Sequence, residues 1–177
     1  YAMVPFMGIY RSVEAKELPL KRLVYPVPHP INPFLGVHFT LTLDGKVKIG
    51  PTAIPILGRE QYSWAKGWSL PDIGQALIAG TALIRGRAHS LGEILKSELP
   101  KLRESSLARE SANLVPDASQ IEAWEKRPPG IRSQLVNIET GKLEQDFIVK
   151  NFHNSSHILN AVSPGWTSAI PFGRWVA

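Results

Sequence analysis

Alternating apolar and polar side chains between residues 34 and 43 constrain the fold more than any other feature of the chain. Because successive side chains of a β-strand point to opposite faces, this pattern predicts a strand with one face in a core. Asp44-Gly45 follows and favours a two-residue type I′ hairpin turn, with residues 46–50 as the return strand. The apolar face is expected to comprise Leu35, Val37, Phe39 and Leu41, and the opposite face Gly36, His38 and Thr40.

Helical spacing replaces this alternation in the middle of the chain. Ser69 is a suitable N-cap, Pro71 fits the first turn, and Asp72 suits the positive end of the helix dipole. Apolar residues at positions 73, 77, 78, 81 and 84 continue the helical pattern. A second helical region is expected over residues 91–114, interrupted at Pro100, which has no backbone N–H to donate.

Strands are expected on both sides of this helical part. The first third adds short strands at residues 6–13, 22–27 and 53–57, and the last third has candidates at 121–125, 131–138, 147–151 and 158–162. Thr140-Gly141 suits a hairpin turn, and a short terminal helix is expected to be interrupted at Pro171. Residues 1–177 therefore predict one α+β unit, a mainly antiparallel sheet with a helical insertion at about residues 70–115.

Composition narrows the possible functions. The chain has no cysteine, which excludes thiolate catalysis and thiolate metal sites. Its net charge of +5 is spread without any block of like charge, so we expect an anionic small ligand and no nucleic acid partner. No apolar run approaches the roughly 20 residues of a membrane-spanning helix. The chain begins at Tyr1 and is expected to be a fragment, so no targeting signal is assigned and a cytoplasmic or membrane-peripheral location on the cytoplasmic side is expected.

Arg132 is the first candidate binding residue. It follows the rigid Pro128-Pro129-Gly130 and shares a strand face with Gln134. A guanidinium presents a planar fork that can bind a carboxylate through two hydrogen bonds. The alternative interpretation is an arginine at a strand end with its charged group in water.

His38 and the C-terminal turn are further candidates. A histidine on the polar face of a strand can act as a base or hydrogen-bond donor toward a ligand, or it can be a structural, hydrogen-bonded residue. Ser163-Pro164-Gly165 precede a short helix, whose N-terminal N–H groups suit an anion or simply form a cap. His153 and His157 lie four apart in a segment with a strand and turn pattern, so no metal site is expected.

Several segments together resemble one enzyme superfamily. They are "YPVPHPINPFLGVHFTLTLDGKVKIGPTAI", "GREQY", "PGIRSQLV", "GKLEQDFIV" and "LNAVSPGWTSAIPFG". In this order and approximate spacing they resemble the FAD-dependent oxidoreductases of the D-amino-acid oxidase superfamily, and are most similar to the L-2-hydroxyglutarate dehydrogenase/oxidase family. The resemblance covers nearly the whole chain but only the C-terminal half or so of that family. The glycine-rich FAD fingerprint of the family's N-terminal domain has no counterpart in the chain.

The resemblance implies the substrate-binding part of an enzyme that oxidises a small 2-hydroxy acid such as L-2-hydroxyglutarate. It implies FAD as the cofactor of the intact enzyme, and neither bound FAD nor turnover for this chain without the N-terminal FAD-binding domain. An apolar surface left uncovered would then favour a homo-oligomer. The implied roles are catalytic for His38, substrate-binding for Arg132, Gln134, Tyr10 and Arg59, and cofactor-binding for Ser163, Pro164, Gly165, Trp166, Thr167 and Ser168.

Two departures from the family and one alternative remain open. Trp166 stands where a small residue is expected, and Pro171 lies in the helix that should follow. The alternative function is a non-catalytic module that binds an anionic small molecule or a partner protein.

Overall fold

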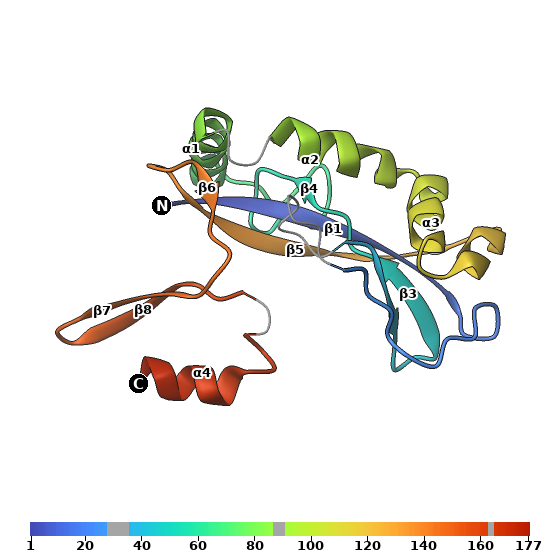
Figure 1. Cartoon of the computed structure of the whole chain (residues 1–177). Helices are drawn as coiled ribbons and strands as arrows, with labels where there is room; N and C mark the ends of the chain where they lie inside the picture. Colours follow the sequence, from blue (N-terminus) through green and yellow to red (C-terminus); the bar gives the residue numbers. More distant parts are fainter. Residues whose placement is uncertain (28–35, 87–90, 163–164) are drawn as a thin grey trace.

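The computed structural model describes residues 1–27, 36–86, 91–162 and 165–177, and Figure 1 shows the arrangement of its elements. The strands are β1 (Ala2–Glu14), β2 (His38–Leu41), β3 (Lys46–Gly50), β4 (Ile54–Pro55), β5 (Glu125–Asn137), β6 (Lys142–Leu143), β7 (Ile148–Phe152) and β8 (Ser155–Asn160). The helices are α1 (Leu70–Gly86), α2 (Leu91–Glu98), α3 (Glu104–Ala112) and α4 (Ala169–Val176), with 3₁₀ turns η1 (Leu99–Leu102) and η2 (Pro116–Gln120).

A curled antiparallel sheet forms the body of the molecule. Its strand order is β2-β3-β1-β5-β6, and the short β4 pairs with β1 beyond the end of β3. All strand pairings in the described residues are antiparallel. Helices α1, α2 and α3 lie along one side of the two long strands β1 and β5 (Figure 1). The α+β prediction, with helices inserted between two groups of strands, is confirmed.

The proline pair in β5 lies at an irregularity in its pairing with β1. Gly8 pairs with Gly130 and Tyr10 with Arg127, so two residues of β5 oppose the single residue Ile9. Those two residues are Pro128 and Pro129, which have no N–H to donate to the ladder. A β-bulge is a position where such residues are tolerated. Because β5 continues through the bulge, it begins earlier than expected, at residue 125.

Two clusters of buried apolar side chains support the sheet. The first joins the N-terminal half of β1 to α1 and α2, and the second joins β2 and β3 to α3 and η2. The first cluster includes Val4, Phe6, Ala79, Leu83 and Val136. The second includes Val13, Phe39, Ile49, Leu107 and Trp124.

The hairpin between β2 and β3 has a different turn from the one predicted. Thr42 N donates to Lys46 O (2.9 Å) and Gly45 N donates to Thr42 O (3.1 Å), which leaves three residues in the loop. Gly45 has a φ of 76°, so the loop is a turn followed by a left-handed glycine, and not a two-residue type I′ turn. The additional loop residue is Leu43, whose side chain is fully exposed.

Most predicted helix boundaries are confirmed. Ser69 caps α1, since its Oγ accepts from Asp72 N (3.3 Å) and donates to Asp72 Oδ2 (2.9 Å). Pro100 lies in η1, which separates α2 from α3 as expected. The interruption predicted at Pro171 is wrong: this proline lies in the first turn of α4, where its missing N–H would have had no partner within the helix.

Two predicted strands are wrong. Residues 22–27 form only an isolated bridge between Val24 and Phe39. Residues 121–124 form no strand, because Trp124 is buried against α3 and its backbone N–H donates to Glu104 Oε1 (3.1 Å) instead of to a neighbouring strand. In both segments, contacts with distant parts of the chain replace the regular pairing that local propensity favours.

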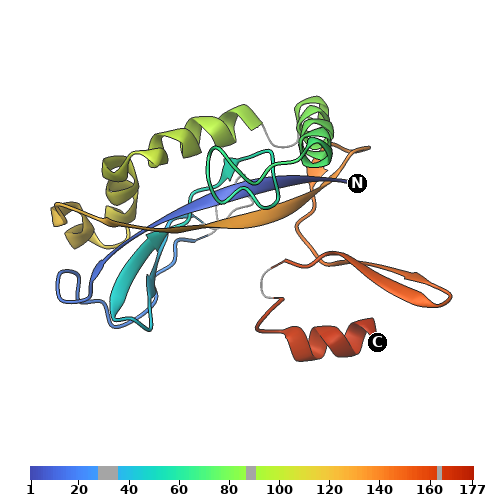
Figure 2. The ribbon, with the colours of Figure 1, turned by 180° about the vertical axis from the view of Figure 1, so that it is seen from behind.

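The C-terminal arm, residues 145–162 and 165–177, contains the β7–β8 hairpin and α4. Figure 1 and Figure 2 show it beside the main body, on the side away from α1, α2 and α3. No residue of α4 is buried, although the rings of Phe147 and Phe172 stack at 4.4 Å. An eight-residue helix is marginally stable without tertiary packing. Because the apolar side chains of the arm are exposed, they form an uncovered apolar surface. Its exposed large side chains are Phe152, Ile158, Leu159, Trp166, Ile170 and Trp175.

Candidate functional site

A notch on the sheet surface brings together side chains from β1, β2 and β3. We define the Gly50 notch by Tyr10, His38, Lys48 and Gly50. His38 pairs directly with Gly50 across β2 and β3, and a Cβ on Gly50 would lie 2.8 Å from Tyr10 Cδ1. Gly50 also has a φ of 130°, which other residues rarely adopt. Glycine is therefore required at this position, where the Tyr10 ring packs against the buried backbone of β3.

The notch lies on the face of β2 and β3 opposite the core. Phe39, Val47 and Ile49 alternate with the notch residues along these strands and are completely buried against α3 and η2. The side chains of His38 and Lys48 must therefore point away from α3. This confirms the predicted division of faces for Val37, Phe39 and His38; Leu41 is 36% exposed at the end of β2, and Leu35 lies outside the described residues.

His38 is held in a defined orientation. Its Nδ1 lies 3.1 Å from the carbonyl oxygen of Gly36, and its ring stacks on Tyr25 with centroids 4.4 Å apart. A carbonyl oxygen can only accept, so the proton of the neutral imidazole is assigned to Nδ1 and the lone pair to Nε2. Burial lowers the pKa of His38, and the positive charge of Lys48 lowers it further, against the opposing effect of the Gly36 hydrogen bond. His38 is therefore neutral at pH 7, with Nε2 able to accept a proton.

An NMR titration of the imidazole resonances tests this assignment. We expect the pKa of His38 to lie below its ordinary value of 6.5, because half-burial and Lys48 both disfavour the imidazolium. With a depressed pKa, the contribution of His38 to stability is present above pH 6.5 and is lost as the pH falls through the folded-state value. His38→Gln identifies the resonance by its disappearance. A value of 6.5 or higher would contradict the described environment.

Tyr10 and Lys48 form the other wall of the notch. Burial raises the pKa of Tyr10, with a further contribution from Tyr25, so the phenol keeps its proton at neutral pH. Lys48 Nζ lies 4.5 Å from the centroid of the Tyr10 ring, within the range of a cation–π contact. The wall thus combines a neutral hydroxyl with a positive charge.

Arg132 follows the part of β5 that contacts the Tyr10 ring. A Cβ on Gly130 would lie 3.5 Å from Tyr10 Cε2, so the side-chain direction of Gly130 is toward the Tyr10 ring. Arg132 is two residues further along the regular part of β5 and pairs with Phe6, whose side chain is buried against α1 and α2. Arg132 is exposed, and partial removal from water lowers the pKa of its guanidinium, which stays positively charged at pH 7.

Two other predicted substrate residues have their side chains engaged elsewhere. Gln134 is 2% exposed, and its Nε2 donates to the backbone oxygen of Glu144. Arg59 precedes α1, and its Nε donates to Asp72 Oδ1 (2.7 Å). A substrate would have to share or displace these contacts. The assignment of Gln134 and Arg59 to substrate binding stays a prediction.

The predicted cofactor residues belong to the C-terminal arm. Ser163 and Pro164 lie outside the described residues, and Gly165 N donates to Val162 O (2.7 Å). Trp166 is 92% exposed. Thr167 and Ser168 lead directly into α4. The turn therefore opens a helix as expected, and its role toward a cofactor stays a prediction.

The described residues do not fit the pyrophosphate of FAD. A dinucleotide is held by a glycine-rich turn between a parallel strand and a helix, where the helix N-terminus faces the phosphates. Every pairing among the described strands is antiparallel, so this part of the chain contains no such unit. If the chain takes part in FAD chemistry, the phosphates must be held by another part of the protein or by another chain.

Lys48, Gly50 and Tyr25, which all contact or neighbour His38 or Tyr10, were not identified from the sequence. Lys48 could have been, since it alternates with the apolar Val47 and Ile49 and so shares the face of His38. Tyr25 could not, because it lies outside any regular element and its stacking on His38 depends on the path of the chain before β2.

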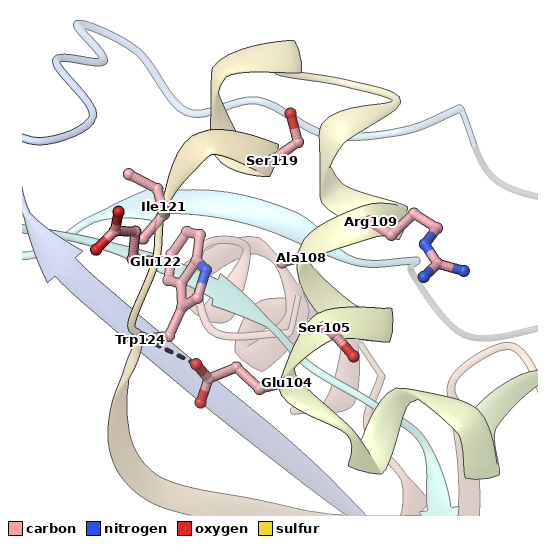
Figure 3. A pocket seen from close by; sticks show the side chains of 8 residues that line it. All are labelled: Glu104, Ser105, Ala108, Arg109, Ser119, Ile121, Glu122 and Trp124. Atoms are coloured by element: carbon pink, nitrogen blue, oxygen red, sulfur yellow. Dashed lines mark hydrogen bonds between the residues drawn. The ribbon is translucent and has the colours of Figure 1, made fainter.

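A separate surface depression lies between α3, η2 and the segment leading into β5. It encloses about 330 Å³. Figure 3 shows that Arg109 points away from Trp124 and that Glu104 is engaged by the Trp124 backbone N–H. Its polar groups do not converge on one point. The residues that line it are Glu104, Ser105, Ala108, Arg109, Ser119, Ile121, Glu122 and Trp124.

Two further kinds of site were sought among the described residues. They contain no group of three or more histidine, aspartate or glutamate side chains placed to hold a metal ion. None of the described helices is both long and apolar enough to cross a membrane.

Comparison with characterised proteins gives one consistent result. The chain is 33% identical to an L-2-hydroxyglutarate dehydrogenase of Indibacter alkaliphilus, over 98% of its own length and 43% of that protein. It is 34% identical to the L-2-hydroxyglutarate dehydrogenase of Escherichia coli K12, over 99% of its own length and 41% of that protein. The mitochondrial L-2-hydroxyglutarate dehydrogenase of Nematostella vectensis is 30% identical to the chain, over 99% of the chain and 39% of that protein. The chain thus spans about two fifths of the length of these relatives. No protein-family model matches it.

Proposed function

Because the chain matches the L-2-hydroxyglutarate dehydrogenase family over nearly its whole length, we propose that it is the substrate-binding part of an FAD-dependent oxidoreductase acting on a small 2-hydroxy acid, with L-2-hydroxyglutarate as the leading substrate. The observation that supports the proposal is that β2 and β5 bring two suitable groups toward Tyr10: His38 Nε2, which can accept a proton, and the cation Arg132, two residues beyond the Gly130 position beside the Tyr10 ring.

Each residue has a defined task in this proposal. Arg132 binds a substrate carboxylate through its planar fork and so fixes the position of the neighbouring hydroxyl-bearing carbon. His38 Nε2 accepts the hydroxyl proton, which requires the neutral imidazole that the lowered pKa provides. The Tyr10 hydroxyl, which keeps its proton, can donate a hydrogen bond to a substrate oxygen.

Oxidation also needs an acceptor for the hydride that leaves the hydroxyl-bearing carbon. FAD would supply it, held by a domain equivalent to the part of the relatives that this chain does not match. The described residues alone then bind the substrate without turning it over. The uncovered apolar surface of the C-terminal arm is consistent with a missing domain, and in its absence we expect self-association.

Ligand titrations of the 177-residue chain, followed by NMR, test the proposal. We expect L-2-hydroxyglutarate to shift backbone resonances of β1, β2, β3 and β5 saturably, and glutaramide, which has no carboxylate, to leave them unchanged. We further expect no flavin absorption to remain on the chain after incubation with FAD and gel filtration. Resonances unmoved by millimolar L-2-hydroxyglutarate would refute the substrate assignment, and a yellow protein would refute the dependence on another domain.

A further inference from the structure

Strand β1 changes its pairing on both sides at Ile9. On one side, β1 pairs with β4 up to Met7 and with β3 from Arg11, and the partner strands have one more residue between these two points than β1 has. On the other side, the two prolines of the β5 bulge lie opposite Ile9. The regular ladder is therefore interrupted along both edges of β1, directly before Tyr10.

The hydroxyl of Thr52 bridges the interruption on the β3 and β4 side. Thr52 is 3% exposed, and its Oγ1 accepts from Ile9 N (3.0 Å) and donates to Met7 O (3.2 Å). One side chain thus makes the kind of hydrogen bonds that a neighbouring strand makes to β1 elsewhere. Backbone groups left without a partner inside a sheet are unfavourable. The two bonds therefore fix the path of β1 through Ile9.

The segment that carries Thr52 is itself held from two sides. Ala53 N donates to the buried carboxylate of Glu98 (2.7 Å), which belongs to the helical part of the chain. A Cβ on Gly8 would lie 2.6 Å from Pro51 Cβ, so only glycine allows Pro51 to approach β1 this closely. Thr52 is therefore a fixed support for β1.

Tyr10 is the side chain whose position depends most directly on this support. It follows Ile9, and its ring packs beside two glycine positions, Gly50 on β3 and Gly130 on β5. Lys48 Nζ lies 4.5 Å from the centroid of the ring. Neither glycine has a side chain that could hold the ring in place. The direction of the β1 backbone at Ile9 therefore decides where the Tyr10 hydroxyl lies.

We propose that Thr52 is a positioning residue for Tyr10: its two hydrogen bonds hold β1 in the path that places the Tyr10 ring in the Gly50 notch, beside Lys48. Threonine suits this task because its hydroxyl can accept and donate at the same time. The role of Tyr10 toward a substrate rests on the proposed function, whereas the position of its ring can be measured without any ligand.

An NMR comparison of ligand-free variants tests the inference. In the wild-type chain, the ring current of Tyr10 should move the ε-methylene protons of Lys48 upfield. Thr52→Val replaces the hydroxyl by a methyl group of similar size, and should remove most of this upfield shift. Thr52→Ser keeps the hydroxyl and should retain the shift.

Thr42→Val is the matched control. The hydroxyl of Thr42 also bonds to two backbone groups, since it donates to Lys46 O (2.9 Å) and accepts from Lys46 N (3.1 Å), but in the loop after β2. The control should lower the midpoint of thermal unfolding and leave the upfield shift of Lys48 unchanged. A shift lost in Thr52→Val alone then reports the position of Tyr10 and not a general loss of stability.

Binding measurements show whether Thr52 acts through Tyr10. Tyr10→Phe should weaken binding of L-2-hydroxyglutarate about threefold to tenfold, as the loss of one neutral hydrogen bond implies. Thr52→Val should weaken it by a similar factor. The double variant should bind no worse than either single variant, because the same contact is lost only once.

The outcomes separate this inference from the proposed function. A Lys48 shift that survived in Thr52→Val, or that was lost in Thr52→Ser or Thr42→Val, would overturn the role of the Thr52 hydroxyl, as would additive losses of binding in the double variant. If Thr52→Val did not fold, the shift in Thr52→Ser would decide. A wild-type chain that bound no L-2-hydroxyglutarate would refute the proposed function, and the ligand-free comparison would still decide the role of Thr52.

Discussion

Replacing Glu98 by alanine is expected to lower the free energy of unfolding by about 3 kcal/mol or more, because it breaks a buried ion pair. Glu98 is 3% exposed and Lys101 is 8% exposed, and their charged groups are 2.6 Å apart. The other carboxylate oxygen of Glu98 accepts from Ala53 N at 2.7 Å. The substitution leaves a buried cation short of one partner and a buried N–H without its acceptor.

Chemical denaturation followed by circular dichroism measures this loss. Arg59→Ala is the matched control, since the Arg59 side chain in its ion pair with Asp72 is largely exposed, and its loss should cost much less than that of Glu98. Replacing both Glu98 and Lys101 by leucine and methionine should recover much of the loss, because no charge is then left buried. A Glu98→Ala variant as stable as Arg59→Ala would show that the pair is not buried in solution.

The same ion pair has a consequence at alkaline pH. Burial acts to lower the pKa of Lys101, but its contacts with Glu98 and Glu110 outweigh burial and raise the pKa above 10.5. The stabilisation that this implies is therefore fully present below pH 10.5 and is lost as the pH rises through the folded-state value. In Glu98→Ala this alkaline loss should be smaller.

The second large effect is expected at Arg132. Arg132→Ala should weaken binding of L-2-hydroxyglutarate about tenfold to a hundredfold, since a charge-assisted contact contributes roughly 1.5–3 kcal/mol. Arg132→Lys keeps the charge but loses the planar fork, so binding should still fall about tenfold. The measurement is the dissociation constant from the same NMR titration that tests the proposed function.

A stability measurement shows whether Arg132 acts through the ligand or through the fold. Arg132 is exposed, so we expect the midpoint of thermal unfolding to change little in Arg132→Ala. Arg22→Ala, which removes another exposed arginine, should change neither binding nor stability. If Arg132→Ala kept wild-type affinity, or failed to fold, Arg132 would be a surface or structural residue.

Local periodicity was sufficient to predict much of the fold. The alternation around His38 correctly separated its face from that of Phe39 and Val37, because a strand inverts its side chains at every residue. Ser69 and Pro100 correctly predicted where one helix begins and where another is interrupted, since capping and the missing proline donor act within one turn. These features depend on neighbours a few residues away and can therefore be inferred from sequence.

Contacts between distant segments could not be inferred in this way. The strands expected at residues 22–27 and 121–124 do not form, because these segments make other contacts with distant parts of the chain. Val24 makes a single bridge to Phe39, and Trp124 packs on α3. The hairpin after β2 was expected from Asp44-Gly45, but its three-residue loop depends on which residues pair across the strands. Register is a property of two segments together.

The candidate site also combines features that the sequence indicates with features that only distant contacts create. The sequence by itself indicated His38 and Arg132, because their residue types and their places on strands suit a base and a carboxylate anchor. Only the tertiary structure stacked Tyr25 on His38, placed Lys48 over the Tyr10 ring and paired Lys46 with Glu14. It also buried Gln134 against the backbone of Glu144. Burial and charge pairing decide what a side chain can do, and both depend on residues far away in the chain.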